Sequence, residues 1–232
     1  MSLRADAVLF DKDGTLFDFG ATWDVWGGEV IAELSEGDRA LQEAMAASAG
    51  YDLARKSFRP DSPVIAGTNR EAAECLAREL PHRTLEEVET HLMRAAAQAP
   101  LSEAVPLVPF LAQLAAMEMA LGVMTNDTEF AARSHLRTAG VEGMFDFIAG
   151  FDSGYGAKPD PDPLLAFAVA TNTPPDRVVM VGDSSHDLIA GRAAGMQTVG
   201  VLTGPACEAD LAPLADIVLP DIGGLLGWLT SV

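Results

Sequence analysis

Short apolar runs separated by helical patterns predict a parallel β-sheet. The strongest runs are Ala5–Phe10, Met119–Met124, Val178–Val181 and Thr198–Leu202, and weaker ones are Phe147–Ala149 and Ile217–Leu219. Patterns with helical spacing lie at Glu129–Thr138, Pro163–Ala170, Asp187–Ala194 and Ile222–Leu229. Buried strands that alternate with helices are typical of βαβ units, whose strands run parallel and whose helices cover both faces of the sheet. The sequence therefore predicts an α/β protein.

The segment from residue 18 to residue 100 breaks this alternation and contains no convincing strand. Its helical patterns cover Val25–Leu34, Ala40–Ala47, Thr68–Leu80 and Thr84–Ala97. Thr68 and Thr84 are expected N-caps, and Glu87 would complete a capping box with Thr84. Gly27 and Gly28 weaken the first helix. We expect an all-helical domain of residues 18–100, inserted after the first strand into a core domain of residues 1–17 and 101–232.

The formal net charge of the chain is −19 at pH 7. Nucleic acids and anionic membranes are bound by clustered Lys and Arg, so neither is expected as a partner. A small phosphorylated metabolite remains compatible if a local cation or a metal overrides this field. Cys75 and Cys207 are the only cysteines and form no CxxC pair. They predict two buried thiols in a cytoplasmic protein, which we expect to be a monomer or a homodimer.

Four aspartates follow predicted strands. Asp11 and Asp13 come after the first strand, and Asp183 and Asp187 come after the run that begins at Val178. Sites in open parallel sheets form beyond the carboxyl ends of the strands, so the two pairs should meet. Carboxylates this close repel one another, and Mg²⁺ with its preference for oxygen ligands would offset that repulsion. The alternative for each pair is an ordinary turn or helix start.

Two further candidates lie at strand ends or in loops. Thr125 and Asn126 follow the strand that ends at Met124, where a hydroxyl and helix-initiating amides could bind an anion. Ordinary N-capping is the alternative for both residues. Lys158 is one of three lysines and lies in a loop rich in Gly and Pro. The alternative for Lys158 is a solvated surface side chain.

The order of these motifs carries a family resemblance. The series is DKDGTLFD from Asp11 to Asp18, then Thr125, then Lys158 in AKPDPDPL, then GDSSHD from Gly182 to Asp187. Over residues 5–18 and 101–204 this resembles the haloacid dehalogenase superfamily, and within it the phosphoglycolate phosphatase-like branch. The resemblance implies a Rossmann-like sheet and makes the inserted segment a cap domain.

The resemblance also implies a role for each motif residue. Asp11 would be the nucleophile that takes the phosphoryl group, and Asp13 would be the general acid and base. Lys158 would stabilise the charge of Asp11 and of the phosphoryl group. Thr125, Asn126 and Gly14 would bind the phosphate. The predicted metal site consists of Asp11, Asp13, Asp183 and Asp187, with Mg²⁺ as the cofactor.

The implied function is a Mg²⁺-dependent phosphatase, a phosphoric monoester hydrolase. It would act on a small phosphorylated metabolite, phosphoglycolate-like or a sugar phosphate, through an aspartyl-phosphate intermediate. Two alternatives stay open: a phosphomutase of the same family, and a non-catalytic regulatory protein on the same fold. In the cap domain Arg70 is the candidate for substrate contact, whereas Trp23 and Trp26 are expected in the cap core. His186 is either a substrate contact or a solvated helix residue.

Overall fold

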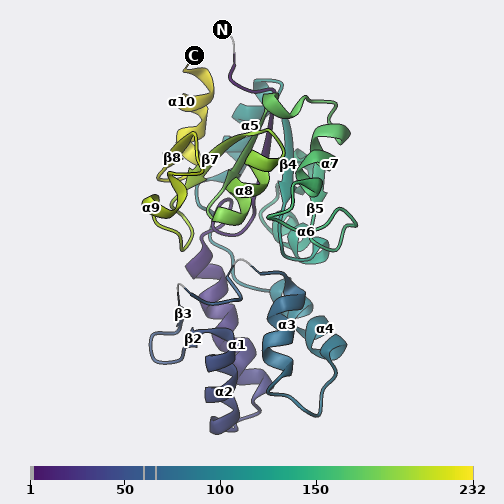
Figure 1. The fold of residues 1–232 in the computed structure, drawn as a ribbon, viewed down its shortest axis with the longest axis vertical. Coiled ribbons are helices and arrows are strands. Elements are labelled where there is room, and N and C mark those ends of the chain that lie inside the picture. Colours follow the sequence, from purple (N-terminus) through teal and green to yellow (C-terminus); the bar gives the residue numbers. More distant parts are fainter. Residues whose placement is uncertain (1–2, 60, 66, 232) are drawn as a thin grey trace.

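A six-stranded parallel sheet forms the centre of the larger part of the molecule (Figure 1). The computed structural model describes residues 3–59, 61–65 and 67–231. The strands are β1 (Ala7–Phe10), β4 (Ala120–Met124), β5 (Phe147–Ala149), β6 (Val178–Gly182), β7 (Gln197–Val201) and β8 (Ile217–Leu219). Their order across the sheet is β5-β4-β1-β6-β7-β8. The predicted α/β fold is confirmed, and each of the six apolar runs supplies a strand.

Strand β1 is buried on both faces because apolar residues occupy both of its alternating rows. Val8 and Phe10 belong to one hydrophobic cluster, and Ala7 and Leu9 belong to another. Successive side chains of a strand point to opposite faces, so a run without polar residues requires cover on both sides. The hydrophobic clusters on the two faces of the sheet meet this requirement.

Helices cover the two faces of the sheet. They are α5 (Leu107–Ala116), α6 (Glu129–Thr138), α7 (Asp162–Ala170), α8 (Ser185–Ala193), α9 (Glu208–Leu211) and α10 (Leu225–Thr230). Helices α5, α6 and α10 contribute leucines to the cluster around Phe10. Helices α7 and α8 contribute Phe167 and Ala190 to the cluster around Leu9. This is the predicted two-sided arrangement.

The inserted segment, residues 18–100, has a hydrophobic core of its own at one end of the molecule (Figure 1). Its elements are the π-helix Gly20–Asp24, α1 (Val25–Leu34), α2 (Arg39–Ala49), β2 (Tyr51–Asp52), β3 (Ser57–Phe58), α3 (Asn69–Ala77) and α4 (Leu85–Ala96). Capping boxes start α3 at Thr68 with Glu71, and α4 at Thr84 with Glu87. The two strongest helix predictions of this segment are therefore confirmed.

The expectation of an all-helical insertion was wrong, because β2 and β3 form a short antiparallel hairpin. Helix α1 also runs without a break through Gly27 and Gly28. A Cβ atom at Gly27 would lie 2.7 Å from the ring of Phe58, and one at Gly28 would lie 2.7 Å from the Tyr51 hydroxyl. The two glycines thus leave a flat helix face on which the aromatic rings of the hairpin pack.

The two connections between the inserted segment and the sheet lie side by side. The Asp18 amide donates to the Ser102 carbonyl at 2.8 Å, and the Ala104 amide donates to Leu16 at 2.9 Å. Phe17 forms an isolated antiparallel bridge with Glu103 between these bonds. We call these paired strands of chain the neck. The neck brings the ends of a long insertion together beside the carboxyl end of β1.

The cysteines differ from the expectation of two buried thiols. Cys75 is buried in α3, but Cys207 is exposed, because it precedes the short helix α9 at the surface and its thiol donates to Asp210.

Within the described ranges, none of the helices combines the length and the apolar character that crossing a membrane requires.

Gly150, which follows β5, is predicted to be essential for packing. A Cβ atom there would lie 2.2 Å from the backbone nitrogen of Glu129 and 2.6 Å from the carbonyl oxygen of Asp127. We expect Gly150→Ala to lower the free energy of unfolding by about 1–3 kcal/mol, because backbone atoms have to move. Gly143→Ala is the control, since a Cβ atom at Gly143 meets nothing within 4 Å. Urea unfolding of both variants measures the difference, and equal stabilities would contradict the prediction.

Candidate active site

One pocket lies where the carboxyl ends of β1, β4 and β6 face the inserted segment. From the sheet side it is lined by Asp11, Asp13, Thr125, Asn126, Asp127, Lys158, Asp183, Ser184, His186 and Asp187. From the neck and the inserted segment it is lined by Phe19, Trp23, Trp26, Phe58, Val64, Ile65, Gly67, Thr68, Asn69, Ala72 and Ala96. The sheet side is polar and acidic, whereas the opposite side is mainly apolar.

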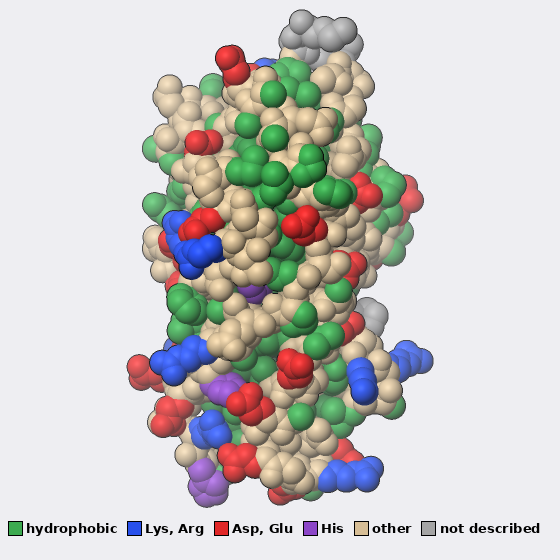
Figure 2. All heavy atoms as spheres, turned by 180° about the vertical axis from the view of Figure 1, so that it is seen from behind, with side chains coloured by type: hydrophobic (Ala, Val, Ile, Leu, Met, Phe, Trp, Pro, Cys, Tyr) green, Lys and Arg blue, Asp and Glu red, His purple; other side chains and the backbone are tan. Residues whose placement is uncertain are grey.

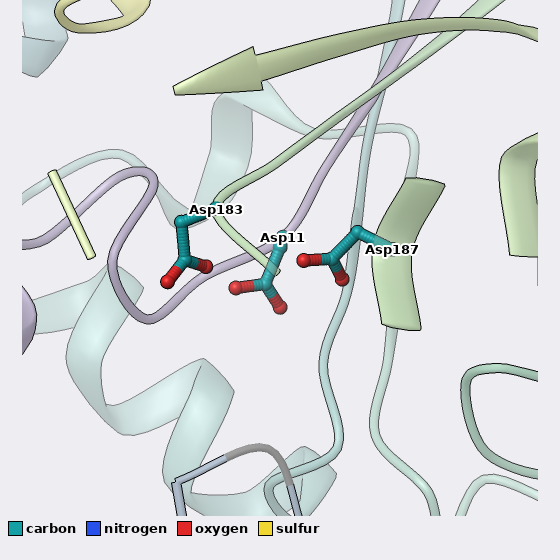
Figure 3. A group of neighbouring side chains, drawn as sticks. All are labelled: Asp11, Asp183 and Asp187. Atoms are coloured by element: carbon teal, nitrogen blue, oxygen red, sulfur yellow. The ribbon is translucent and has the colours of Figure 1, made fainter. Parts of the chain in front are cut away.

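Three carboxylates form a buried cluster at the base of this pocket. Figure 3 shows Asp11 between Asp183 and Asp187, and one oxygen atom from each lies within 4.8 Å of the others. Gly14 and Gly204 make room for this cluster, because a Cβ atom at either would collide with the Asp183 side chain. Burial raises the pKa of Asp11 to about 7, and the neighbouring Asp187 carboxylate adds to the rise. Burial and then Asp11 raise the pKa of Asp183.

Lys158 is the only lysine or arginine that lines the described pocket, and its ammonium group is buried. Its Nζ donates to Asp11 Oδ1 and to Asp187 Oδ1, each at 2.6 Å, and to the Met124 carbonyl at 2.9 Å. An ammonium group has three hydrogens, so each has an acceptor. Burial opposes the charge of Lys158, but the Asp11 and Asp187 carboxylates outweigh it and raise the pKa. Lys158 therefore remains a cation.

The backbone of Lys158 is held by Asn126. The Lys158 amide donates to Asn126 Oδ1, and Asn126 Nδ2 donates to the Lys158 carbonyl, both at 2.9 Å. This reciprocal pair joins the loop after β4 to the loop before α7. The loop after β4 is itself ordered, because the Asp127 amide donates to the Thr125 hydroxyl at 3.1 Å.

Asp13 belongs to a second ionic group, centred on the fully buried Lys12. Lys12 Nζ donates to Asp13 Oδ1 at 2.9 Å, to Asp127 Oδ2 at 3.1 Å and to His135 Nδ1 at 2.9 Å. Its charge also lies 5.2 Å from the centre of the Trp23 ring. Burial opposes the charge of Lys12, but Asp13 and then Asp127 outweigh it and raise the pKa. Two adjacent acids, Asp11 and Asp13, thus have different lysine partners.

His135 links this second group to the inserted segment. Because Lys12 can only donate, His135 Nδ1 accepts, and Nε2 donates to the Ala96 carbonyl at 2.7 Å. Burial, followed by the charge of Lys12, lowers the pKa of His135 to about 4. The imidazole is therefore neutral at physiological pH and acts here as a fixed hydrogen-bonding link.

Three candidate residues have side-chain or backbone contacts that differ from those the sequence predicted. Asp13 is not among the described carboxylates that cluster for a metal, because its side chain turns to Lys12. The Gly14 amide donates to the Phe17 carbonyl at 2.7 Å and is therefore unavailable to a phosphate. Arg70 does not line the pocket, because it is half exposed and pairs with Glu89 at 2.9 Å.

The remaining candidates lie where they can take part in a site. Thr125 is buried and lines the pocket beside Asn126. His186 lines the pocket too, and its Nδ1 is buried without a hydrogen-bond partner among the described residues. Trp26 is buried in the core of the inserted segment, as expected, and Trp23 packs against that core. Both tryptophans also line the pocket, in addition to their expected place in the core.

Sequence reasoning missed Lys12, Asp127 and His135 as site residues. Lys12 was visible as a rare lysine between two candidate acids, and that position was the only signal. Asp127 resembled a helix-start residue after Thr125. His135 lies within α6 and had no local motif, so only the folded chain brings it to Lys12.

The cluster at the pocket base fits a hard divalent cation. Its donors are carboxylate oxygens, which Mg²⁺ prefers, and they converge from β1 and from the start of α8. Lys158 contacts Asp11 and Asp187 but has no remaining hydrogen for Asp183. Burial is the main cause of the raised pKa values of Asp11 and Asp183, and the surplus of negative charge among the three carboxylates adds to it. A cation at this cluster would neutralise that surplus.

The fold and the pocket define an α/β protein with an acidic site at the carboxyl ends of its strands. Residues 5–195 match the family model of haloacid dehalogenase-like hydrolases. The chain belongs to this family, and the family resemblance seen in the motifs is confirmed.

Individual relatives are similar to this chain in sequence over part of its length or in structure over nearly all of it. A phosphoglycolate phosphatase of Neisseria meningitidis is 40% identical over 117 residues, 50% of this chain and 49% of its own length. A tyrosine-protein kinase PtkA of Mycobacterium bovis is 44% identical over 96 residues, 40% of this chain and 32% of its own. The chain thus matches about half, or less, of the length of these curated relatives. The crystal structure of a predicted phosphoglycolate phosphatase from Haemophilus somnus has a TM-score of 0.71 at 18% identity and covers 97% of both chains.

Mg²⁺ is expected to raise the melting temperature of the protein. A ligand at a concentration of about 100 times its Kd stabilises the folded state by about 2.7 kcal/mol. Asp183→Asn should lose this response and should itself melt higher than the wild type without metal, because one of the repelling charges is gone. The control is Asp176→Asn, an exposed aspartate before the opposite end of β6. Differential scanning calorimetry with and without Mg²⁺ measures the shift, and an unchanged response in Asp183→Asn would contradict the metal site.

Lys12→Met is expected to lower the free energy of unfolding by about 3–5 kcal/mol, the usual cost of removing one partner of a buried ion pair. The substitution keeps the apolar stem but leaves Asp13 and Asp127 near each other without their shared cation. Lys56→Met is the matched control, because Lys56 is exposed. Urea unfolding followed by circular dichroism gives both values. A loss below about 1 kcal/mol, the range of surface ion pairs, would show that Lys12 does not hold this group together.

Proposed function

We propose that the protein is a Mg²⁺-dependent phosphatase that hydrolyses a small phosphomonoester through a phosphorylated Asp11. The observation that supports this most directly is the different setting of the two neighbouring acids. Asp11 lies in the carboxylate cluster with Lys158, whereas Asp13 lies outside it with Lys12. Two carboxyl groups with different surroundings can act as a nucleophile and as a proton carrier in one reaction.

In the first step an oxygen of Asp11 attacks the phosphorus atom of the ester. The bond between phosphorus and the ester oxygen breaks, and Asp13 gives its proton to the departing alkoxide. Lys158 favours the ionised form of Asp11 and orients its carboxylate through the contact of 2.6 Å. The Thr125 hydroxyl lines the pocket beside Asp11 and is the candidate donor to the phosphoryl oxygens.

In the second step water attacks the same phosphorus atom. Asp13, now a carboxylate, takes a proton from this water, and the bond between phosphorus and Asp11 breaks to release phosphate. The link from Lys12 to Asp13 fixes the position of the acid in both steps. Both steps use one pair of carboxyl groups, so no further acid is required.

Asp11, Asp183 and Asp187 would hold the Mg²⁺, which supplies positive charge to the phosphoryl oxygens as charge develops on them. Asp187 also accepts from the Ser184 amide and hydroxyl, at 3.0 and 2.7 Å, and these bonds fix its orientation. Asp187 therefore supports the cluster from the first turn of α8. Residues 18–100 act as a cap domain over this site, supported by their separate core and by the residues they contribute to the pocket.

A phosphomutase would use the same two acids, and a regulatory protein could keep the same fold. Release of free phosphate in stoichiometric amounts supports the phosphatase. Formation of an isomeric phosphate ester without free phosphate would support a mutase. No reaction with any ester in the presence of Mg²⁺ would support a regulatory protein.

Asp13→Asn should separate the two steps. An alkyl phosphate leaves as a basic alkoxide, so without the acid its hydrolysis should fall by about 10²–10⁴-fold. p-Nitrophenyl phosphate leaves as a stabilised phenolate and should still phosphorylate Asp11, giving a burst of one nitrophenol per enzyme before turnover stalls.

Asp11→Asn is the matched control and should show no burst, because an amide is a much poorer nucleophile. Stopped-flow absorbance measures both bursts. Wild-type turnover of both esters by Asp13→Asn would exclude Asp13 as the acid and base.

A further inference from the structure

We propose that the group esterified to phosphate in the substrate is uncharged and mainly apolar, with a hydrogen-bond acceptor, and is not a carboxylate. This rests on the proposed function and specifies the substrate class of the same pocket. An aromatic or short hydrocarbon group that bears a hydroxyl, carbonyl or ether oxygen meets this description. Phosphoglycolate, named for several relatives, does not meet it.

The wall opposite the aspartates is built from apolar side chains. Phe19, Trp23, Trp26, Phe58, Val64 and Ile65 form most of it. Trp23 and Trp26 contact each other edge to face, with ring centres 5.0 Å apart. Ligand pockets lined in this way gain affinity from apolar contact and select for groups without charge.

The wall contains no cation that could pair with a second anionic group. No Lys or Arg of the inserted segment lines the described pocket. The two undescribed positions within this segment are a proline and an alanine in the sequence, so they add no charge. A carboxylate buried against this wall would lose its hydration without gaining a cationic partner, which is unfavourable.

The basic residues of the inserted segment lie on its outer surface instead. Figure 2 shows Lys and Arg side chains there, interspersed with Asp and Glu. Several form ion pairs at the surface: Arg39 with Glu43, Arg55 with Asp52, Arg59 with Asp61, Arg70 with Glu89 and Arg83 with Glu36. Lys56, Arg78 and Arg94 are also exposed. The segment therefore has many cations but directs them away from the pocket.

The polar side of the pocket is also unfavourable for a second anion. Five aspartates line it, and Lys158 is the only Lys or Arg among its described lining residues. All three hydrogens of Lys158 already have acceptors, and so do those of Lys12 behind the pocket. A divalent cation would offset the charge of a phosphate group. A further carboxylate on the substrate would be repelled by the negative charge of the aspartates that remains unbalanced.

Two hydrogen-bond donors in the apolar wall indicate that the substrate carries a hydrogen-bond acceptor. The indole nitrogens of Trp23 and Trp26 are buried, and neither has a hydrogen-bond partner in the described part of the chain. Buried indole N–H groups usually have an acceptor. Both residues line the pocket, although their indole nitrogens are covered in this conformation, and a rotation of either ring would present its N–H group to a neutral oxygen on the substrate.

The test compares esters that differ by one charge. Benzyl phosphate is compared with 4-carboxybenzyl phosphate, and 2-hydroxyethyl phosphate with phosphoglycolate, all with the full chain and Mg²⁺. We expect kcat/KM to be higher for the uncharged member of each pair by about tenfold or more, the range over which apolar pockets discriminate. Equal or higher kcat/KM for the carboxylated members would overturn the inference.

Failure of the proposed function is distinguished by p-nitrophenyl phosphate. If neither this activated ester nor the others release phosphate, the phosphatase assignment fails. Calorimetric binding of benzylphosphonate and 4-carboxybenzylphosphonate in Mg²⁺ then tests the pocket by itself. Tighter binding of benzylphosphonate would support the apolar wall, and tighter binding of the carboxylated compound would overturn it.

A charge placed in the wall should change this selectivity. Ile65→Arg adds a cation inside the pocket and should shift the ratio of kcat/KM about tenfold toward 4-carboxybenzyl phosphate, since a buried charge gains a partner. Val25→Arg is the matched control, because Val25 is 45% exposed and does not line the pocket. The control should keep the wild-type ratio. A shift of the same size in both variants would show that net charge, and not the wall, decides selectivity.

Discussion

The contact on which the site depends is the ammonium group of Lys158 buried between Asp11 and Asp187. Three carboxylates cannot be buried together in ionised form unless positive charge is placed among them. Lys158 supplies part of that charge and, through the Met124 carbonyl, ties the end of β4 to β1 and to α8. The Asn126 pair holds its backbone. The attraction between Lys158 and the carboxylates therefore holds together segments that are distant in sequence.

Much of the fold follows from short-range patterns. The six apolar runs became the six strands because each is short, consists mainly of apolar residues and is followed by a turn or a helix start. The common pocket of Asp11, Thr125 and Asp183 follows from topology, since the carboxyl ends of parallel strands meet at one edge of a sheet. The N-caps Thr68 and Thr84, and the capping box of Thr84, could be predicted because their contacts are local.

The parts that could not be predicted depend on contacts between distant residues. Gly27 suggested a weak helix, and only its packing against Phe58 shows why a glycine is needed there. The partners of Lys12 could not be predicted from the sequence around it, because His135 lies in α6, far along the chain. Arg70 was a reasonable candidate as a cation at a helix start, but its pairing with Glu89 of α4 directs it outward. The local sequence limits which residues can belong to the pocket, whereas tertiary packing decides which of these candidates line it.

The neck makes the inserted segment modular. Since Asp18 pairs with Ser102 and Leu16 with Ala104, the chain leaves and re-enters the core at almost the same place. Sequence changes within the insertion can therefore accumulate without altering the register of the sheet or the lysine contacts of Asp11. Evolution can in this way change the side of the pocket that the inserted segment contributes while keeping the residues of the sheet side. Such changes are possible because the two ends of the inserted segment lie side by side in the neck.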